Sequence, residues 1–339
     1  MNKKKSRLEN KSNEPYFVAE MNTSHFGNLA NAKKMIKNAL NCGFDCVKFQ
    51  SWSPDSLYSS KFLHENPVAA RFFKKYSLSP SQLKELSKYC NEIGIEFSST
   101  PYSHDEVDFL IDECKASFVK VASMDLNNHA FLNYISLKKV PVVLSTGMGT
   151  MEEIDSAVSI FEKGGIENIC ILHCVSLYPT PRHLVNLKNI SSIIERFPKS
   201  KVGYSDHTED IETAIASIAL GASLIEKHFT LDKKKIGFDN QMASEPDLLK
   251  DLILKCKSVY HSLGTRERRV SKEELAQREK MRRSIVAATN LERKIISIDD
   301  VEFKRPGNGM STEKVGDILG KKLKIPKLKG SIILPSDLE

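Results

Sequence analysis

Short apolar runs alternate with longer amphipathic segments from residue 16 to about residue 264. Eight of these runs have the length and apolar content of buried strands, and each is followed by residues with helical periodicity. The predicted strands cover 16–21, 46–50, 96–100, 118–123, 141–146, 169–174, 201–206 and 223–229. Such an alternation is typical of βα units that build a parallel sheet.

Several predicted helices carry specific signals at their ends. Residues 79–82 (SPSQ) form the pattern of a capping box with proline at the first helical position, and Thr150 with Glu153 repeats the box without proline. Glycine adopts the left-handed conformation that closes a helix, so three glycines mark helix ends just before the next strand: Gly43, Gly94 and Gly165. These signals support the alternation of strand and helix.

Eight βα units over this length predict a closed (β/α)8 TIM barrel, since an open doubly wound sheet usually has about five or six strands. After Gly264 the pattern changes to a charged helical segment and then to short strand-like pieces with glycine and proline turns. The predicted organisation has four parts. They are a flexible N-terminal arm (1–14), a catalytic barrel (15–265), a helical linker (266–281) and a small β-rich domain (282–339).

Composition narrows the class of protein. The chain has 339 residues, 40% of them hydrophobic and 27% charged, which is typical of a soluble globular protein. The apolar stretch 214–225 is shorter than the ~20 residues of a membrane span, and the N-terminus lacks the apolar core of a secretory signal. We therefore expect a cytoplasmic protein without a membrane contact. Its seven cysteines show no metal-type spacing and are expected to be buried, reduced thiols.

The net charge of +7 is unevenly distributed along the chain. Residues 1–14 carry +3 and residues 266–339 carry +6, which leaves −2 for the part between them. Basic termini could bind nucleic acid. Recognition of nucleic acid also requires a binding motif or aromatic residues interleaved with the basic ones, and Trp52 is the only tryptophan of the chain. The sequence therefore predicts no nucleic-acid partner.

The active site of a (β/α)8 barrel lies at the carboxyl ends of its strands. Here those ends carry charged, amide, hydroxyl and imidazole groups: Glu20, Lys48, Gln50, Lys120, Ser123, Ser145, Ser205, His207, Glu226 and His228. A buried lysine without a partner costs several kcal/mol, roughly. One explanation for Lys48 and Lys120 is a structural ion pair with an acidic neighbour, for which the candidates are Glu20, Asp125 and Glu226.

The other explanation for the two lysines is an anion site. Together with the hydroxyls of Ser123, Ser145 and Ser205 and the loop amide at Gly147, the lysines could hold a phosphate and a carboxylate. This interpretation predicts a small substrate with two or three negative charges.

Two histidines end neighbouring strands and suggest a metal site. His207 and His228 lie where adjacent strands are ~4–5 Å apart, so their rings could share one ion. Two nitrogens leave positions open for water and substrate oxygens, which suits Mn²⁺ or Mg²⁺ better than a closed structural zinc site. A hydrogen-bonded structural role or a proton shuttle is the alternative. For His173 we favour a buried structural role.

The strand-end motifs also resemble a known family. VKFQ, SSTPYS, VKVAS, LSTGM, HCVSLYPTP, GYSDHT and EKHFT, in this order, are similar to the sialic acid synthase (N-acetylneuraminate synthase) family of nonulosonic acid synthases. RRSIVA, FKRPGNGM and ILGKKL at the C-terminus resemble the family's antifreeze-like (SAF) domain, a small β-clip fold. The resemblance spans nearly the whole chain.

The resemblance implies a function. Members of the family condense phosphoenolpyruvate with an N-acylated mannosamine-type sugar, use a divalent metal, Mn²⁺ or Mg²⁺, and release phosphate as a nine-carbon keto acid forms. Lys48, Lys120, Ser123, Ser145 and Ser205 match the family's phosphoenolpyruvate positions.

Other positions match the family's metal and acceptor sites. His207 and His228 match its metal ligands. Four residues match positions near the metal or the sugar: Glu20, Tyr178, Glu226 and Asp239. Arg305 matches an arginine that reaches into the barrel of the other subunit, which implies a domain-swapped homodimer.

The sequence departs from the family pattern near the expected acceptor. The first-strand motif is EMNTSHFG, with Asn22 and Ser24 where the family has E-x-G-x-N-H-x-G, and Ser176 replaces an asparagine. N-acetylmannosamine is the default acceptor, and a 6-deoxy diacetamido sugar, which leads to legionaminic or pseudaminic acid, is the alternative. A Schiff-base aldolase using Lys120 and a sugar-binding protein without turnover are the other candidate functions.

Overall fold

The computed structural model describes residues 6–9, 14–237 and 239–339. The chain divides after Gly264 into two compact units, Met1–Gly264 and Thr265–Glu339. Within the described residues, no helix is long and apolar enough to cross a membrane. Each unit has its own hydrophobic core, so each is described separately below.

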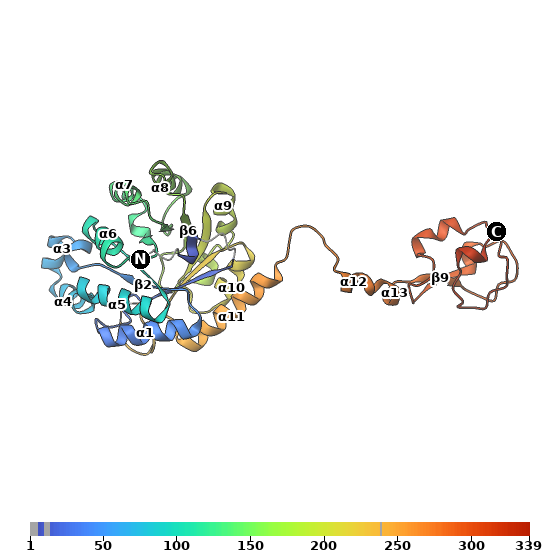
Figure 1. Ribbon diagram of the computed structural model, residues 1–339, viewed down its shortest axis with the longest axis horizontal. Coiled ribbons are helices and arrows are strands. Elements are labelled where there is room, and N and C mark those ends of the chain that lie inside the picture. Colours follow the sequence, from blue (N-terminus) through green and yellow to red (C-terminus); the bar gives the residue numbers. More distant parts are fainter. Residues whose placement is uncertain (1–5, 10–13, 238) are drawn as a thin grey trace. The chain divides into compact units, whose positions relative to one another are not determined.

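The first unit is a closed barrel of eight parallel strands with helices around it (Figure 1). The strands follow the chain in order, and β1 closes the barrel by pairing with β8. The strands are β1 Tyr16–Glu20, β2 Cys46–Gln50, β3 Glu96–Thr100, β4 Val119–Val121, β5 Val142–Ser145, β6 Ile169–Cys174, β7 Lys201–Asp206 and β8 Leu224–His228. All eight lie within the segments predicted from the hydrophobic pattern, which confirms the TIM barrel.

Helices cover the outside of the strands, and all of them except the short α2 and α3 bury apolar residues. The helices of this unit are α1 Leu29–Cys42, α2 Pro54–Leu57, α3 Ser60–Glu65, α4 Pro67–Tyr76, α5 Pro80–Ile93, α6 His104–Asp108, α7 His129–Leu137, α8 Met151–Lys163, α9 Asn189–Arg196, α10 Glu212–Ala219 and α11 Pro246–Ser262. The capping boxes at Ser79 and Thr150 are present, and Gly43 and Gly94 end their helices in the left-handed conformation.

The connection between β2 and β3 is longer than a single helix. Before α5 it contains α2, α3 and α4, two of which begin at a proline in the first helical turn. Aromatic side chains from this insertion pack together as a separate small cluster, which includes Trp52, Phe73 and Tyr76. The insertion therefore adds an apolar structure at the carboxyl ends of the strands.

Residues 6–9 differ from the flexible arm expected for the N-terminus. Leu8 is buried in a cluster with the first residues of several strands, and the Lys201 ammonium donates to its carbonyl at 2.7 Å. Ser6 Oγ donates to Glu96 Oε2 at 2.5 Å. The apolar side chain of Leu8 explains this packing, because it covers the amino end of the barrel. The rest of the expected arm, 1–5 and 10–13, lies outside the described residues.

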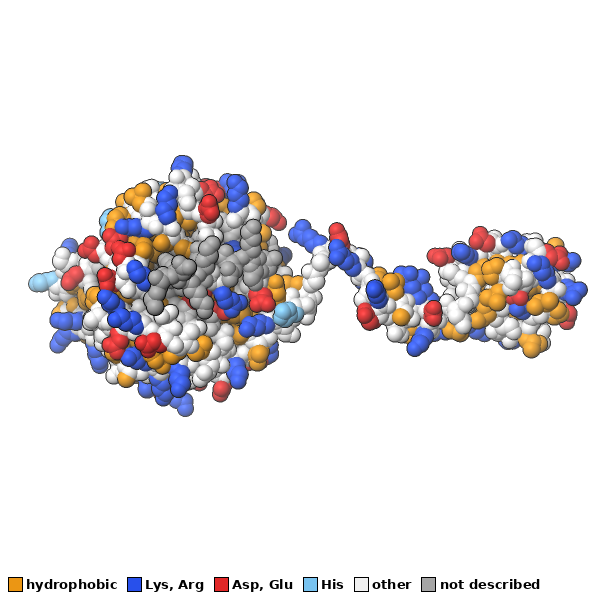
Figure 2. All heavy atoms as spheres, in the orientation of Figure 1, with side chains coloured by type: hydrophobic (Ala, Val, Ile, Leu, Met, Phe, Trp, Pro, Cys, Tyr) orange, Lys and Arg blue, Asp and Glu red, His pale blue; other side chains and the backbone are white. Residues whose placement is uncertain are grey.

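The second unit contains short helices and a small antiparallel sheet. Helices α12 Lys272–Ala276 and α13 Arg278–Met281 cover only the second part of the expected helical linker, and β9 Ser284–Ala287 pairs antiparallel with β10 Val301–Lys304. Further single bridges, such as Ile295 with Lys322, replace longer strands. On the face shown in Figure 2, basic side chains and hydrophobic side chains are interspersed over this unit.

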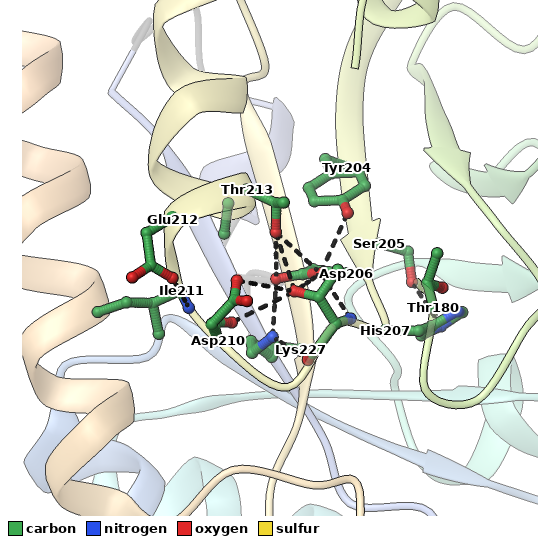
Figure 3. A network of polar contacts seen from close by, with 12 residues as sticks. Thr180, Tyr204, Ser205, Asp206, His207, Asp210, Ile211, Glu212, Thr213 and Lys227 are labelled. Atoms are coloured by element: carbon green, nitrogen blue, oxygen red, sulfur yellow. Dashed lines mark hydrogen bonds and ion pairs between the residues drawn. The ribbon is translucent and has the colours of Figure 1, made fainter. Parts of the chain in front are cut away.

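Successive side chains along β7 and β8 point to opposite faces of the sheet, and this alternation separates two sets of polar residues. Asp206 and Lys227 are register partners, and their side chains form a buried ion pair at 2.7 Å on the side of the strands that faces the helices (Figure 3). Thr208, Thr213 and Tyr204 also donate to the Asp206 carboxylate. Both residues end strands in the sequence, but they are part of the structural layer and not of the barrel mouth.

This ion pair should contribute strongly to the stability of the barrel. We expect Lys227→Met to lower the free energy of unfolding by about 3 kcal/mol, because it leaves the Asp206 carboxylate buried without its cation. Urea unfolding measured by circular dichroism gives this value. The matched control is Lys255→Met, which removes an exposed ion pair with Asp251 and should cost less than about 1 kcal/mol. Equal effects of the two substitutions would contradict the prediction.

Candidate active site

The carboxyl ends of the strands enclose a cavity of about 410 Å³. Twelve residues that sequence analysis assigned to a site line it together: Glu20, Lys48, Gln50, Lys120, Ser123, Ser145, Tyr178, Ser205, His207, Glu226, His228 and Asp239. Gly147 is adjacent, because its backbone N–H donates to Ser123 Oγ at 3.0 Å. The residues predicted from strand ends, and Tyr178 and Asp239 predicted from the family resemblance, therefore lie around one cavity of the barrel.

Two lysines and two glutamates form a buried ionic cluster in this cavity. Lys48 Nζ contacts Glu20 Oε2 and lies 3.7 Å from Glu226 Oε2. Lys120 Nζ donates to Glu226 Oε1 at 3.2 Å, and Ser205 Oγ donates to the same oxygen at 3.0 Å. The four charged residues are at most 4% exposed. The ion pairs of the structural explanation are thus present, with Glu20 and Glu226 as partners, and the same lysines line the cavity.

Strand register explains how this cluster forms. In the parallel ladder Glu20 is the partner of Lys48 on one side and of His228 on the other. Ser205 is likewise the partner of Glu226. Register partners in neighbouring strands project from the same face of the sheet, so these side chains meet inside the barrel.

Burial and the neighbouring charges shift the pKa values of the cluster. Burial raises the pKa of Glu20 more than Lys48 lowers it. Burial acts in the same direction on Glu226, but the ammonium groups of Lys120 and Lys48 outweigh it and lower the pKa of Glu226 to about 2. Burial lowers the pKa of Lys120. Glu226 is therefore held as a carboxylate between two cations, whereas Glu20 binds a proton more readily.

Hydroxyl and amide groups line the part of the cavity above β4 and β5. Ser123 Oγ accepts from the Gly147 N–H and lies 3.3 Å from Cys174 Sγ. A Cβ atom at Gly147 would lie 2.2 Å from Ser176 Oγ and 2.9 Å from Ser123 Oγ, so a larger residue here would displace both hydroxyls. These groups and the two lysines are the donors that an anionic ligand requires.

The histidine pair fits a divalent metal ion. His207 Nδ1 donates to the Val175 carbonyl at 2.8 Å, which leaves the lone pair on Nε2, and the two ring centroids are 5.4 Å apart. His228 Nδ1 is buried and has no hydrogen-bond partner. Burial lowers the pKa of both imidazoles, so both are neutral, as ligands must be. No group of three or more His, Cys, Asp or Glu side chains suited to a metal occurs among the residues described.

Other residues position the side chains of the cavity. Gln50 Nε2 donates to Glu20 Oε1 at 3.2 Å, and Trp52 Nε1 donates to Gln50 Oε1 at 3.1 Å. The Asn22 amide donates to the Asp239 carboxylate. Sequence analysis placed Asn22 near the expected acceptor without giving it a role, and it did not assign Trp52 to the site. The signal for Trp52 was its position two residues after Gln50, the last residue of β2.

Two further residues considered in the sequence analysis, His173 and Arg305, do not line the cavity. His173 points away from it, because its Nε2 contacts the Val185 carbonyl at 2.7 Å and its ring stacks on Tyr204, which agrees with a structural role. Arg305 belongs to the second unit, where its side chain is exposed. The loop that carries it is held by Ser284 Oγ, which donates to the Pro306 carbonyl at 2.6 Å and accepts from the Gly309 N–H at 2.8 Å.

The first unit is a TIM barrel, and its charged cavity lies at the carboxyl ends of the strands. TIM-barrel enzymes have their active sites at this end of the barrel. Comparison with known proteins identifies the family: residues 35–268 match the NeuB family, and residues 282–339 match the SAF domain. The chain therefore belongs to the NeuB family of nonulosonic acid synthases.

Individual relatives and structures agree with this family. The chain is 37% identical to an uncharacterised protein of Methanocaldococcus jannaschii, covering 98% of this chain and 97% of that protein. It is 35% identical to the N,N'-diacetyllegionaminic acid synthase of Campylobacter jejuni, covering 90% and 94%. The crystal structure of the N-acetylneuraminic acid (sialic acid) synthetase of Leptospira borgpetersenii in complex with citrate matches with a TM-score of 0.73 and 29% identity, covering 78% of this chain and 91% of that one.

Proposed function

We propose that this protein is an enzyme that condenses phosphoenolpyruvate with an N-acylated mannosamine-type sugar to a nine-carbon 2-keto-3-deoxy acid and releases inorganic phosphate. The observation that carries the proposal is the cavity in which two buried lysines, three serine hydroxyls and two neutral histidines meet. The family and the sialic and legionaminic acid synthases among its relatives support the same reaction.

The lysines and hydroxyls would bind the phosphoenolpyruvate anion. Lys48 and Lys120 provide two ammonium groups, and Ser123, Ser145 and Ser205 provide hydroxyl groups in the same cavity. Binding by fixed donors orients C3 of phosphoenolpyruvate toward the C1 aldehyde of the open-chain sugar, so that the carbon–carbon bond can form. The positive charge that then develops at C2 lies close to the Glu20 and Glu226 carboxylates, which stabilise it.

A glutamate would then activate the water that adds to C2. Both oxygens of Glu226 face ammonium groups, and one also accepts from Ser205. Glu20 Oε1 instead accepts from amide groups, the Asn22 backbone and Gln50. We therefore assign the proton transfer to Glu20 and the fixing of the lysines to Glu226. The tetrahedral intermediate expels phosphate, so the C–O bond breaks and the P–O bond does not.

His207 and His228 would hold a divalent metal ion, Mn²⁺ or Mg²⁺. When bound there, such an ion supplies Lewis acidity toward the aldehyde oxygen. Tyr178 lies near both imidazoles, with its ring tilted to that of His207 at 4.2 Å between centroids and edge to face with that of His228 at 6.0 Å, and the Asp239 carboxylate accepts a hydrogen bond from the Asn22 amide. These residues are placed to position the sugar next to the metal.

A Schiff-base aldolase is the second candidate function. The buried Lys120, whose pKa is lowered by burial, has the property that such a nucleophile requires. Borohydride trapping with pyruvate separates the two reactions, because only the aldolase forms a covalent adduct on Lys120. We favour the synthase because Lys120 Nζ is ion-paired with Glu226.

The synthase reaction predicts metal-dependent phosphate release. The full-length protein with phosphoenolpyruvate, Mn²⁺ and an N-acylated mannosamine-type sugar should release inorganic phosphate, and a chelator should abolish the release. Glu20→Gln should lower kcat about 10²–10⁴-fold, since it removes the proposed general base. Absence of phosphate release from the folded protein with every acceptor would reject the synthase and favour a protein that only binds sugar.

The metal site predicts a binding measurement that does not depend on activity. His207→Ala should weaken Mn²⁺ binding by on the order of 100-fold in isothermal titration calorimetry, because half of the protein ligands are removed. His261→Ala changes an exposed histidine of the same unit and should leave the affinity unchanged. Equal affinities for the two variants would contradict the assignment of His207.

Arg305 allows a test of the domain-swapped homodimer that the family resemblance implies. If this arginine reaches the cavity of a second subunit, Arg305→Ala should lower activity by at least about 10-fold in a folded protein, whereas Arg293→Ala, an exposed arginine of the same domain, should not.

Mixed dimers test whether Arg305 acts in the other subunit. Unfolding and refolding Arg305→Ala together with Glu20→Gln should restore about a quarter of wild-type activity, because each mixed dimer would contain one complete site. If mixing restores nothing, Arg305 does not act across the dimer.

A further inference from the structure

Two hydrogen bonds in series connect the insertion before α5 to the glutamate that we assign as general base. Trp52 Nε1 donates to Gln50 Oε1 at 3.1 Å, and Gln50 Nε2 donates to Glu20 Oε1 at 3.2 Å. All three side chains line the cavity. Glu20 is the last residue of β1 and Gln50 is the last residue of β2, so the two bonds cross from one strand end to the next.

The backbone geometry at the end of β2 places Gln50 and Trp52 on the same side of the chain. Successive side chains of an extended chain point to opposite faces, so Gln50 and Trp52 both line the cavity and Ser51 between them does not. Ser51 Oγ lies 2.6 Å from Ser99 Oγ, and the Ser51 backbone N–H donates to the Thr100 carbonyl at 2.9 Å. These contacts with β3 hold the backbone between the two cavity residues.

The indole ring of Trp52 is held by the packing of the insertion. Trp52 is 6% exposed, and its ring meets that of Phe73 edge to face with centroids 6.0 Å apart. Phe73 in turn stacks on Tyr58 at 4.3 Å, with an angle of 14° between the rings. A capping box between Ser53 and Ser56 fixes the start of α2 directly after Trp52. The packing of the insertion therefore sets the position of the indole N–H.

The indole determines which way the Gln50 amide points. A glutamine amide has a donor end and an acceptor end of nearly the same shape, and a half turn of the amide exchanges them. The indole N–H of Trp52 can only donate, so its partner must be the Gln50 carbonyl oxygen, and the NH2 group then faces Glu20. In the turned state two donors would face each other, and the carbonyl oxygen would face the Glu20 carboxylate.

The Gln50 amide in turn holds the Glu20 carboxylate. Glu20 Oε1 accepts from the Asn22 backbone N–H at 2.8 Å as well as from Gln50, and Glu20 Oε2 contacts Lys48. Together these donors fix the rotation of the carboxylate, whose terminal torsion is otherwise broad. The orientation matters for a general base, because a misplacement of about 1 Å can cost on the order of 100-fold in rate.

We propose that Trp52 is a positioning residue: through the Gln50 amide it holds Glu20 in the orientation that accepts a proton from the water that adds to C2. The inference rests on the proposed function, which assigns this proton transfer to Glu20. It requires no contact between Trp52 and the reacting atoms. It also gives the aromatic insertion a part in the reaction, since the packing around Phe73 fixes the indole and the indole fixes the amide.

A double-mutant cycle tests this role. Phosphate release from phosphoenolpyruvate is measured for the full-length protein with Mn²⁺ and an N-acylated mannosamine-type sugar. We expect Trp52→Phe, which keeps an aromatic ring but removes the N–H, to lower kcat about 10-fold and to change KM for phosphoenolpyruvate by less than about 2-fold. In the Gln50→Met background the same substitution should lower kcat by less than about 2-fold, because the amide that Trp52 orients is gone.

The matched control for Trp52→Phe is Tyr76→Phe. Tyr76 is 8% exposed and belongs to the same aromatic cluster but does not line the cavity, so its substitution should leave kcat unchanged. An unchanged kcat in Trp52→Phe, or an equal fold loss in both backgrounds, would overturn the inference and leave the synthase reaction intact. Absence of phosphate release from the wild-type protein with every acceptor would reject the proposed function and, with it, this inference.

The hydrogen bond between Trp52 and Gln50 can also be tested without activity. Trp52 is the only tryptophan of the chain, so the protein has a single indole N–H resonance in a proton–nitrogen correlation spectrum. Gln50→Met should move this resonance upfield in the proton dimension, because the indole loses its acceptor. Gln277→Met, at an exposed glutamine of the second unit, should not move it. An unmoved resonance in Gln50→Met would overturn the inference whatever the kinetic result.

Discussion

The site depends on the need to pair every charge that the barrel buries. Lys48, Lys120, Glu20 and Glu226 are at most 4% exposed, and each would be costly to bury alone. Glu20, Lys48, Glu226 and Lys120 alternate in charge, which makes the cluster close to neutral without a ligand. The same arrangement leaves ammonium groups on the cavity surface, where an anion can compete for them. The proposed anion binding would thus use the same side chains that pair inside the barrel.

Closure of the barrel brings the four buried charges together. Because successive side chains of a strand point to opposite faces, these charges stay separate from the residues that face the helices. Along β8, Glu226 and His228 face the cavity while Lys227 between them pairs with Asp206 under the helices. A register shift of one residue would exchange the two sets and place Lys227 in the cavity. The Asp206–Lys227 pair therefore helps to fix the register on which the site depends.

The barrel and the floor of the site could be predicted from sequence because both follow from short-range rules. Short apolar runs located every strand, and the carboxyl ends of parallel strands converge, so Glu20, Lys48 and His228 could be placed together without coordinates. The side that faces the helices was harder to predict, because Asp206 and Lys227 end strands as the site residues do. Leu57 and Phe73 could not be assigned, since their position depends on how α2 and α4 pack, and apolar residues at helical spacing are usually core. The packing of Leu8 under the barrel depends likewise on long-range contacts.

The charged groups and the aromatic groups of the cavity come from different levels of the structure. The ionic cluster and the histidine pair are at strand ends, where the barrel fixes every spacing and a change affects its neighbours. The aromatic side chains that line the cavity, Trp52, Tyr58 and Phe73, are on an insertion with its own caps and its own aromatic cluster. Substitutions there can alter the cavity surface without breaking a buried ion pair, because the insertion packs on itself and not on the charged cluster.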